Sequence, residues 1–293
     1  VVISTFVVMV VCACPAAMGQ GPAKTGLVAY YQFEGNLVDV SGSGHGATAS
    51  GGGEAVFVNG FFGRAVDTRE SAVDCGTWDP SDPDTDAFSA SCWVYWLGLQ
   101  GAAAQWQGVL AKRTGWGAGL SRWQLELGDN SATAYLTNQP NGGPGSVTLT
   151  QDEWQLIAIT FDGSDAAIYL DGERVGGGAW TLDNDIDAPL CIGMSQPTNG
   201  NKFNGYIDEV AFWNRGLSEN EIAFLYNSGE GQPIMGPPTT ATEPSPADGA
   251  VDVAQDTALG WTPSAFAASH NVYFGTSWDD VNNASADAPT GVL

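Results

Sequence analysis

Three tryptophans in the middle of the chain are the residues best suited to bind a ligand. Trp106, Trp116 and Trp123 fall in or beside loops, and Trp116 lies between two glycines. The face of a tryptophan ring can stack on the apolar C–H face of a sugar. We therefore expect these rings to form a ligand surface. The alternative is that they cover the edge of a β-sandwich.

Carboxylates form a second group of candidates. Four aspartates cluster in the segment 77–86, which two prolines keep out of regular structure: Asp79, Asp82, Asp84 and Asp86. Clustered carboxylate oxygens suit Ca²⁺. The segment lacks the glycine and the terminal glutamate of an EF-hand loop, so a solvated, charge-rich turn is the preferred interpretation.

Two further carboxylates, Asp208 and Glu209, interrupt the otherwise apolar segment 205–213. A carboxylate that is buried alone costs free energy. We therefore expect backbone donors, a cation or a metal ion to meet these side chains.

The chain has few of the residues and motifs that nucleophilic or metal-dependent catalysis requires. It has two histidines, His45 and His270, which fall in different predicted domains, so a Ser-His-Asp triad or a histidine zinc site is disfavoured. Neither a Gly-x-Ser-x-Gly elbow nor a Gly-Lys-Ser/Thr phosphate loop occurs. We expect the chain not to be an enzyme, although a catalytic domain beyond residue 293 remains open.

The segment 154–175 is the element around which the chain is organised. Asp-Gly pairs separate three β-prone segments, 154–161, 166–170 and 173–175, which predicts a three-stranded antiparallel meander. In the first of these, both alternating sets of side chains are largely apolar. This strand should therefore be covered on both faces, at the centre of a sandwich.

The same segment resembles a known family. Trp-x-x-Ile-Ala-x-Thr-Phe-Asp-Gly, followed by Ile-Tyr-Leu-Asp-Gly-x-x-Val, is similar to the core of the laminin-G-like, concanavalin A-like jelly-roll domains of secreted bacterial proteins. Residues 26–42, 88–95 and 205–210 resemble the family's opening, middle and closing strands. The resemblance covers residues 26–229. It implies an all-β, two-sheet antiparallel jelly-roll sandwich.

This resemblance also bears on function. It implies a structural Ca²⁺ held with the help of Asp39 and Asp208. The glucanases of the family use Glu-x-Asp-x-x-Glu on one strand, and no Glu-x-Asp occurs in this chain. The fold hosts lectins, adhesive modules and hydrolases, so the resemblance is less specific for function than for fold.

A short helix should close this domain. Ser218 and Glu221 form a capping box at its start, and Gly229 is suited to end it with a left-handed residue. One face of the predicted helix is apolar: Ile222, Leu225 and Tyr226. The helix should pack on the sandwich through this face.

The remaining segments predict further parts. Residues 1–19 are typical of a signal peptide, with a lipoprotein signal as the weaker alternative, and no later segment is apolar enough to span a membrane. Residues 230–246 form a Pro/Thr/Gly linker. Residues 247–293 resemble the first half of a fibronectin type III-like module, so we expect a fragment of a longer protein.

The net charge bears on the class of binding partner, and the cysteine content bears on disulfide bonding. The formal net charge is −24, which disfavours binding to nucleic acid. Removal of the leader leaves an odd number of cysteines in apolar segments, Cys75, Cys92 and Cys191, which we expect to be buried and free. A single disulfide among them is the alternative.

These observations predict a secreted or cell-surface protein. Its jelly roll should be a non-catalytic recognition module that binds a glycan or an extracellular protein. The alternatives are an accessory domain of an extracellular hydrolase and a structural adhesin spacer without a small ligand.

Overall fold

The computed structural model describes residues 7–12, 24–50, 53–99, 106–139, 141–197, 201–235, 242–245, 258, 260–262 and 270–275. The chain divides into two compact units, one of residues 20–235 and one of residues 1–19 with 236–293. Each unit is described by itself.

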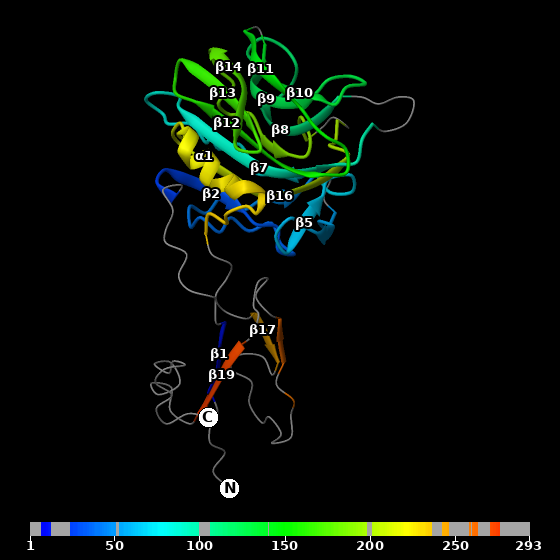
Figure 1. The fold of residues 1–293 in the computed structure, drawn as a ribbon, viewed down its shortest axis with the longest axis vertical. Helices are drawn as coiled ribbons and strands as arrows, with labels where there is room; N and C mark the ends of the chain where they lie inside the picture. The colour runs from blue at the N-terminus through cyan, green and yellow to red at the C-terminus, as the bar shows by residue number, and fades with distance from the viewer. Residues whose placement is uncertain are drawn as a thin grey trace. The chain divides into compact units, whose positions relative to one another are not determined.

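The larger unit is a sandwich of two antiparallel sheets (Figure 1). The seven-stranded sheet has the order β11 (Gly142–Thr148), β10 (Thr133–Asn138), β9 (Ser121–Leu127), β8 (Gln107–Arg113), β15 (Leu190–Ile192), β6 (Val73–Asp74) and β3 (Thr48–Ala49). The predicted two-sheet, all-β sandwich is thus confirmed.

The eight-stranded sheet faces it. Its order is β14 (Glu173–Ala179), β13 (Asp165–Leu170), β12 (Trp154–Phe161), β7 (Phe88–Trp96), β16 (Gly205–Trp213), β5 (Arg64–Asp67) and β4 (Phe57–Asn59), with β2 (Leu27–Tyr31) also paired to β16. The predicted meander is β12, β13 and β14, and β12 is buried along almost all of its length.

Alternation along the strands builds the core between the sheets. In β9, Trp123, Leu125 and Leu127 point inward and are fully buried. Gln124 and Glu126 alternate with them and lie on the outer face, because successive side chains of a strand point to opposite faces. The period-2 pattern of the sequence therefore sets which residues are structural.

The cysteines belong to this apolar interior. Cys75, Cys92 and Cys191 are buried and free. Burial raises the pKa of Cys75 to about 12, so this thiol stays protonated at neutral pH. The prediction of buried free thiols is confirmed.

The helix α1 (Glu219–Tyr226) covers the outer face of the eight-stranded sheet. Its capping box is formed by Ser218 and Glu221, as the sequence predicts. The left-handed residue at its end is Asn227 (φ 47°) and not Gly229, because an asparagine tolerates this conformation and stands two positions earlier. A short 3₁₀ turn, η3 (Asn227–Gly229), follows.

Glycines close one edge of the sandwich. The edge strands β11 and β14 belong to different sheets and pack directly against each other. A Cβ atom on Gly145 would lie 3.1 Å from the backbone nitrogen of Gly177, tighter than an ordinary contact. Glycine is therefore required where the two backbones meet.

The second unit contains two strand pairs within its described residues. β1 (Val7–Cys12) pairs with β19 (His270–Gly275), and β17 (Thr242–Ser245) pairs with β18 (Gly260–Thr262), both antiparallel. Most of the predicted signal peptide (1–19) and of the predicted fibronectin type III-like module (247–293) lies outside the described residues, as do residues 236–241 and 246 of the linker. In the described part of the chain, no helix has the length and apolar character needed to cross a membrane.

Candidate functional site

One end of the sandwich brings together Trp116 and the aspartates of the segment 77–86. There β8 turns into β9, β10 into β11 and β12 into β13, while β7 begins and β14 ends. We call this end the Trp116 rim, and it consists of the loops 77–87, 114–120, 139–141, 162–164 and 180–189. Residue 140 lies outside the described part.

Arg122 anchors two of these loops. Its Nε lies 2.6 Å from Asp79 Oδ2, and its Nη2 donates to Asp86 Oδ1 (2.7 Å) and Ser81 Oγ (2.9 Å). Its Nη1 donates to the carbonyl of Asp183 at 2.9 Å. The guanidinium is buried, so one forked cation holds the loops 77–87 and 180–189 against the start of β9.

This arrangement explains the aspartates of the segment 77–86. Two of them pair with Arg122, and Asp82 accepts hydrogen bonds from the backbone of Asp84 and from the backbone and hydroxyl of Thr85. The Thr85 hydroxyl is the main cause that holds the pKa of Asp82 below its ordinary value. The loop is thus an ordered turn whose countercharge comes from the protein itself.

Trp116 stands at the tip of the loop 114–120 and is 51% exposed. The guanidinium carbon of Arg113 lies 5.8 Å from its ring centroid, a cation–π contact. Asp185 accepts hydrogen bonds from Thr114, and Asp183 accepts one from the backbone of Gly119, which tie this loop to the loop 180–189. An exposed ring is therefore held on a loop fixed at both ends.

A polar network supports Arg113 from below. Arg113 donates to Gln124, and its Nη1 lies 3.6 Å from Glu126 Oε2. Gln124 Nε2 donates to the same carboxylate at 2.8 Å, and Ser195 and Asn201 donate to its other oxygen. Arg113, Gln124 and Glu126 are all buried, so this network fixes the guanidinium and, through it, the indole.

Tyr135 is another exposed aromatic side chain of this sheet, towards the end opposite to the rim. It stands opposite Glu126 in the pairing of β10 with β9, on the outer face, and is 45% exposed. Leu120 and Ile186 add exposed apolar side chains beside Trp116. An apolar, aromatic surface over fixed polar groups suits a ligand that presents both C–H and hydroxyl groups.

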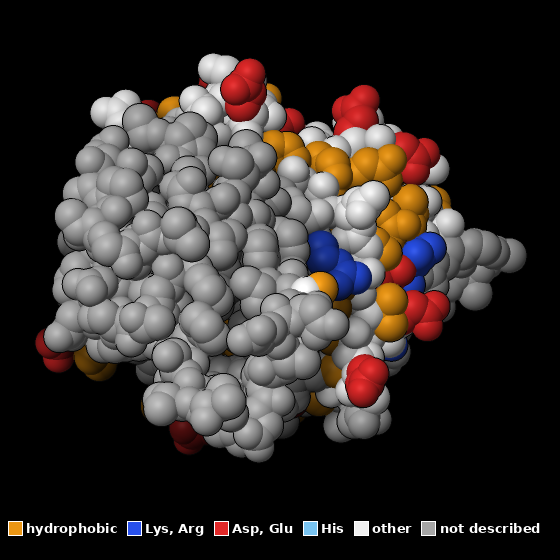
Figure 2. Space-filling model, turned by 90° about the horizontal axis from the view of Figure 1, so that it is seen from below, with side chains coloured by type: hydrophobic (Ala, Val, Ile, Leu, Met, Phe, Trp, Pro, Cys, Tyr) orange, Lys and Arg blue, Asp and Glu red, His pale blue; other side chains and the backbone are white. Residues whose placement is uncertain are grey.

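The cations of the rim are buried. Lys112 is fully buried and donates to the carbonyls of Thr77, Trp78 and Ala188, and burial lowers its pKa to about 8. The rim loops contain no Lys or Arg, whereas Asp84 and Asp187 are exposed. Figure 2 shows Asp and Glu side chains spread around another described face.

The structure separates the three predicted tryptophans. Trp106 is 45% exposed but precedes β8, whereas Trp116 follows this strand, so the two rings lie beyond opposite ends of a seven-residue strand. Such a strand is about 20 Å long. Trp123 is completely buried and stacks on Phe88, so its ring faces the core and not a ligand.

The carboxylate of Asp39 accepts hydrogen bonds from backbone amides. Its Oδ1 accepts from the amides of Tyr30 (3.0 Å) and Ser41 (2.9 Å), and its Oδ2 accepts from that of His45 (2.9 Å). Burial favours the neutral form, but these hydrogen bonds outweigh it and lower the pKa of Asp39. The carboxylate thus fixes the loop after β2.

Asp208 belongs to a different cluster. It is fully buried, its Oδ2 accepts from the amide of Phe62 at 3.0 Å, and its Oδ1 accepts from that of Glu209 at 2.8 Å. Glu209 has a left-handed backbone (φ 52°) at a bulge of β16 and accepts a hydrogen bond from the Tyr30 hydroxyl. Glu34 accepts from the amide of Arg64 and is electrostatically coupled to both carboxylates.

The three carboxylates, Glu34, Asp208 and Glu209, are the main buried acidic group of the sandwich. Burial is the largest cause that raises their pKa values, to about 7 for Glu34, to about 8 for Glu209 and well upward for Asp208, where Glu209 adds repulsion. Buried oxygens of two of them, Glu34 Oε1 and Glu209 Oε1, have no hydrogen-bond partner. Such oxygens seek a proton or a cation.

A metal ion is not preorganised among the described residues. They contain no group of three His, Cys, Asp or Glu side chains already gathered to hold one. Asp39 contacts backbone amides, and the residue coupled to Asp208 from the start of the domain is Glu34. An ion would therefore have to draw Glu34 and the two carboxylates of β16 together.

Sequence reasoning missed several of these residues. Arg122 and Glu126 alternate with Trp123 and Leu125, so the sequence predicts that they lie on the outer face. No neighbouring residue predicts which side chains they contact. Glu34 follows the opening strand in a segment that the family resemblance covers. Its proximity to Asp208 depends on a contact between residues 174 positions apart, which no local pattern encodes.

Comparison with known proteins shows which family the sequence matches. The family model described as the concanavalin A-like lectin/glucanases superfamily, a laminin G type, matches residues 67–223. No curated protein matches the sequence. The match ends well before residue 247, so the fibronectin type III-like module stays without support.

Solved structures share the fold at low sequence identity. Domain 4 of an extracellular arabinanase from Geobacillus stearothermophilus, in complex with arabinotriose, is 19% identical with a TM-score of 0.49, and the match covers 70% of this chain and 98% of that one. The binding domain of Paraclostridial Mosquitocidal Protein 1 is 19% identical (TM-score 0.50; 70% and 53% covered). The receptor binding domain of botulinum neurotoxin C/D mosaic serotype is 13% identical (TM-score 0.51; 70% and 51% covered).

Proposed function

The chain belongs to the concanavalin A-like lectin/glucanases superfamily, and we propose that its sandwich is a non-catalytic recognition module that binds a glycan at the Trp116 rim. The observation that carries the proposal is the half-exposed Trp116 ring held on the buried Arg113. An indole in this position loses little conformational freedom when a sugar stacks on it. Neighbouring apolar side chains exclude water around the contact.

Two features support recognition over catalysis. The chain lacks the Glu-x-Asp strand motif, and its two histidines lie in different units. Three charged side chains of the rim are occupied in structural contacts, since Arg122 holds Asp79 and Asp86. The apolar leader supports an extracellular setting, in which glycans and surface proteins are the available partners.

A glycan array tests this proposal. The full chain, labelled with a fluorophore, is applied to an array of plant, bacterial and animal glycans. We expect W116A to lower binding at least tenfold, which corresponds to about 1.4 kcal/mol. W106A, which removes an equally exposed tryptophan at the opposite end of β8, is the matched control and should bind as the native chain does.

The outcomes separate the alternatives. Binding that W106A abolishes and W116A leaves intact would contradict the assignment to the Trp116 rim. A blank array would support the structural spacer. Binding to the substrate of a hydrolase carried on the same polypeptide would support the accessory-domain alternative.

A structural cation accompanies this proposal. Glu34, Asp208 and Glu209 carry hard oxygen donors, and two of their buried oxygens lack a hydrogen-bond partner. A Ca²⁺ ion that drew these side chains together would stabilise the ionised carboxylates. Glu34 takes the place that the family resemblance implied for Asp39. A bound Ca²⁺ would link the segment after β2 to β16.

Thermal unfolding with a chelator and with added CaCl₂ tests the cation. We expect Ca²⁺ to raise the Tm of the native chain and to have no effect on E34Q. E173Q, which changes an exposed glutamate of β14, is the matched control and should respond as the native chain does. An unchanged Tm in the native chain would mean that the buried carboxylates are held protonated instead.

A further inference from the structure

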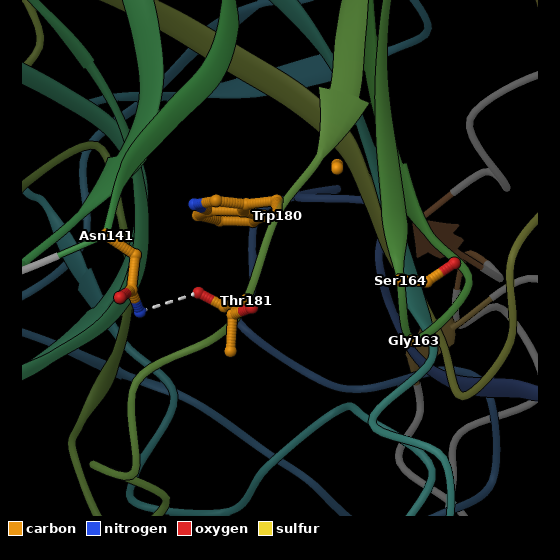
Figure 3. A pocket seen from close by; sticks show the side chains of 6 residues that line it. Asn141, Gly163, Ser164, Trp180 and Thr181 are labelled. Carbon is orange, nitrogen blue, oxygen red and sulfur yellow. Dashed lines mark hydrogen bonds between the residues drawn. The ribbon is translucent and has the colours of Figure 1, made fainter.

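A second polar depression lies on the Trp116 rim, next to the site just described. It has a volume of about 470 Å³ and is lined by residues of three rim loops and the end of β14: Asn141, Gly163, Ser164, Ala179, Trp180 and Thr181. This volume lies within the range of small-molecule sites, roughly 300–1,000 Å³. Figure 3 shows Trp180 between Asn141 and the turn at Gly163 and Ser164.

Hydrogen bonds fix the walls of this depression, which we call the Trp180 pocket. Trp180 Nε1 donates to the carbonyl of Gly142 at 3.0 Å, and its backbone nitrogen donates to the carbonyl of Ser164 at 2.9 Å. Asn141 Nδ2 donates to the carbonyl of Thr181 at 3.0 Å (Figure 3). The pocket is therefore preformed by loops that belong to both sheets.

The lining of the Trp180 pocket carries no charge. It offers an amide and two hydroxyls beside the largely buried ring of Trp180. The side chains of Asn141, Ser164 and Thr181 are all exposed, so their polar atoms reach solvent. Such a lining suits a neutral ligand with several hydroxyl groups.

The pocket adjoins the Trp116 loop through a short piece of chain. Thr181 lines the pocket, and two residues further on Asp183 accepts the hydrogen bond from Gly119, three residues after Trp116. Two residues of extended chain span at most about 7 Å. With the hydrogen bond and the three further residues to Trp116, this path limits the separation to roughly 20 Å, so a ligand of several sugars can contact both places.

The charge of the rim selects against anionic ligands. The rim loops hold no Lys or Arg, and Lys112, Arg113 and Arg122 are buried and bound to protein acceptors. Four aspartates without an ion pair to Arg122 are exposed on or next to the rim loops: Asp84, Asp162, Asp165 and Asp187. The cations nearest to them are Arg174 and Arg215, which line a neighbouring depression with Asp162 and Asp165; Arg215 pairs with Glu221, so the aspartates outnumber the free cations. A sulfate, sialic acid or uronate placed here would be repelled.

We propose that the Trp116 rim binds a neutral oligosaccharide, with one sugar stacked on Trp116 and a further sugar in the Trp180 pocket. This inference rests on the proposed function and adds the class and the minimum length of the ligand. A single sugar reaches only one of the two places. Affinity should therefore rise with chain length until both are filled.

An array of neutral glycans in length series, together with sialylated, sulfated and uronic-acid glycans, tests this inference on the full chain. The neutral series that binds best is then titrated by calorimetry with the native chain, N141A and W116A. We expect the native chain to gain at least tenfold in affinity between the monosaccharide and the trisaccharide or tetrasaccharide. N141A should lose this gain, and W116A should bind every length more weakly.

Asn141 is exposed, so N141A should fold, and its Tm verifies this. N220A, which changes an exposed asparagine of α1, is the matched control and should bind as the native chain does. Preferred binding of anionic glycans, or a length gain that N141A keeps, would overturn the inference.

The same titrations separate the two proposals. Loss of binding in W116A with an unchanged length gain in N141A would leave the proposed function standing and remove the Trp180 pocket. Loss of the gain in N141A with native binding by W116A would remove Trp116 from the site and keep the pocket. A blank array would overturn both.

Discussion

The ring of Trp123 stacks on that of Phe88 with centroids 5.0 Å apart and an angle of 21° between the planes. Trp123 belongs to β9 and Phe88 to β7, so the pair joins the two sheets through the middle of the core. Stacked aromatic pairs of this kind contribute beyond the area that they bury.

We expect W123A to be strongly destabilising. Removal of a large buried aromatic side chain leaves a cavity and typically costs about 3–5 kcal/mol of unfolding free energy. Chemical denaturation of the full chain measures the loss. W116A is the comparison, because an exposed side chain of a loop should change stability by no more than about 0.5 kcal/mol. Equal losses in the two variants would contradict the distinction between core and rim.

R122K should weaken the whole rim. Lysine keeps the positive charge but has no planar fork, so it cannot hold Asp79, Asp86 and the carbonyl of Asp183 together. A buried charge network that loses a partner typically costs about 3–5 kcal/mol, and the retained charge should place R122K at or below the lower end of that range. Denaturant unfolding gives the loss of stability, and the glycan array reports the expected loss of binding.

K202R is a control for this change, since it exchanges one cation for another at Lys202, which bridges to Gly108 near the end of β8 opposite to the rim. It should leave both stability and binding at their native levels. An R122K variant that unfolds at the native denaturant concentration would mean that the two loops hold their positions without the fork.

Alternation along strands accounts for the part of the fold that the sequence predicts well. The Asp-Gly turns of the segment 154–175 are local signals that predict a meander of three strands. The structure contains these strands as β12, β13 and β14. The same alternation places Trp123 with Leu125 and Leu127 in the core. The expectation that Trp123 binds a ligand was wrong, because it rested on the nearby loop and not on the alternation of the strand.

The candidate site could be predicted only in part, because its contacts join distant segments. Trp116 was found because a tryptophan between glycines has no local core to enter. The role of Arg122 depends on loops that lie about 40 and 60 positions away along the chain. Trp180 lines a pocket with Asn141 because the edge strands of two sheets meet there. The periodicity of a single strand does not predict which strands of the two sheets meet.

G143A should test how tightly β11 lies against its neighbour β10. A Cβ atom at Gly143 would come 1.9 Å from the carbonyl oxygen of Leu136, so the backbone would have to move. Overpacking of this kind costs about 1–3 kcal/mol. G46A is the matched control, because a Cβ atom there meets nothing within 4 Å. Thermal unfolding should show a lower Tm for G143A alone, and equal Tm values would contradict the close approach.

Glu221 should make stability depend on pH in the acid range. The guanidinium of Arg215, 2.6 Å away, is the main cause that lowers the pKa of Glu221 to about 2, and the Ser218 hydrogen bonds of the capping box add to it. The folded-state pKa is thus below the unfolded value of about 4.3. The stabilisation is fully present above the unfolded value and is lost as the pH falls from there towards 2.

E221Q removes this titration while keeping a side chain that can accept the Ser218 hydrogen bond. We expect E221Q to be less stable than the native chain at pH 7 by about 1 kcal/mol, the typical contribution of a cap or a partly exposed ion pair. The difference should shrink between pH 4.5 and pH 2, as denaturant unfolding at a series of pH values would show. E219Q, which changes an exposed glutamate of the same helical turn, should follow the native pH profile. A constant difference between E221Q and the native chain across this range would mean that the ion pair with Arg215 does not hold the carboxylate ionised.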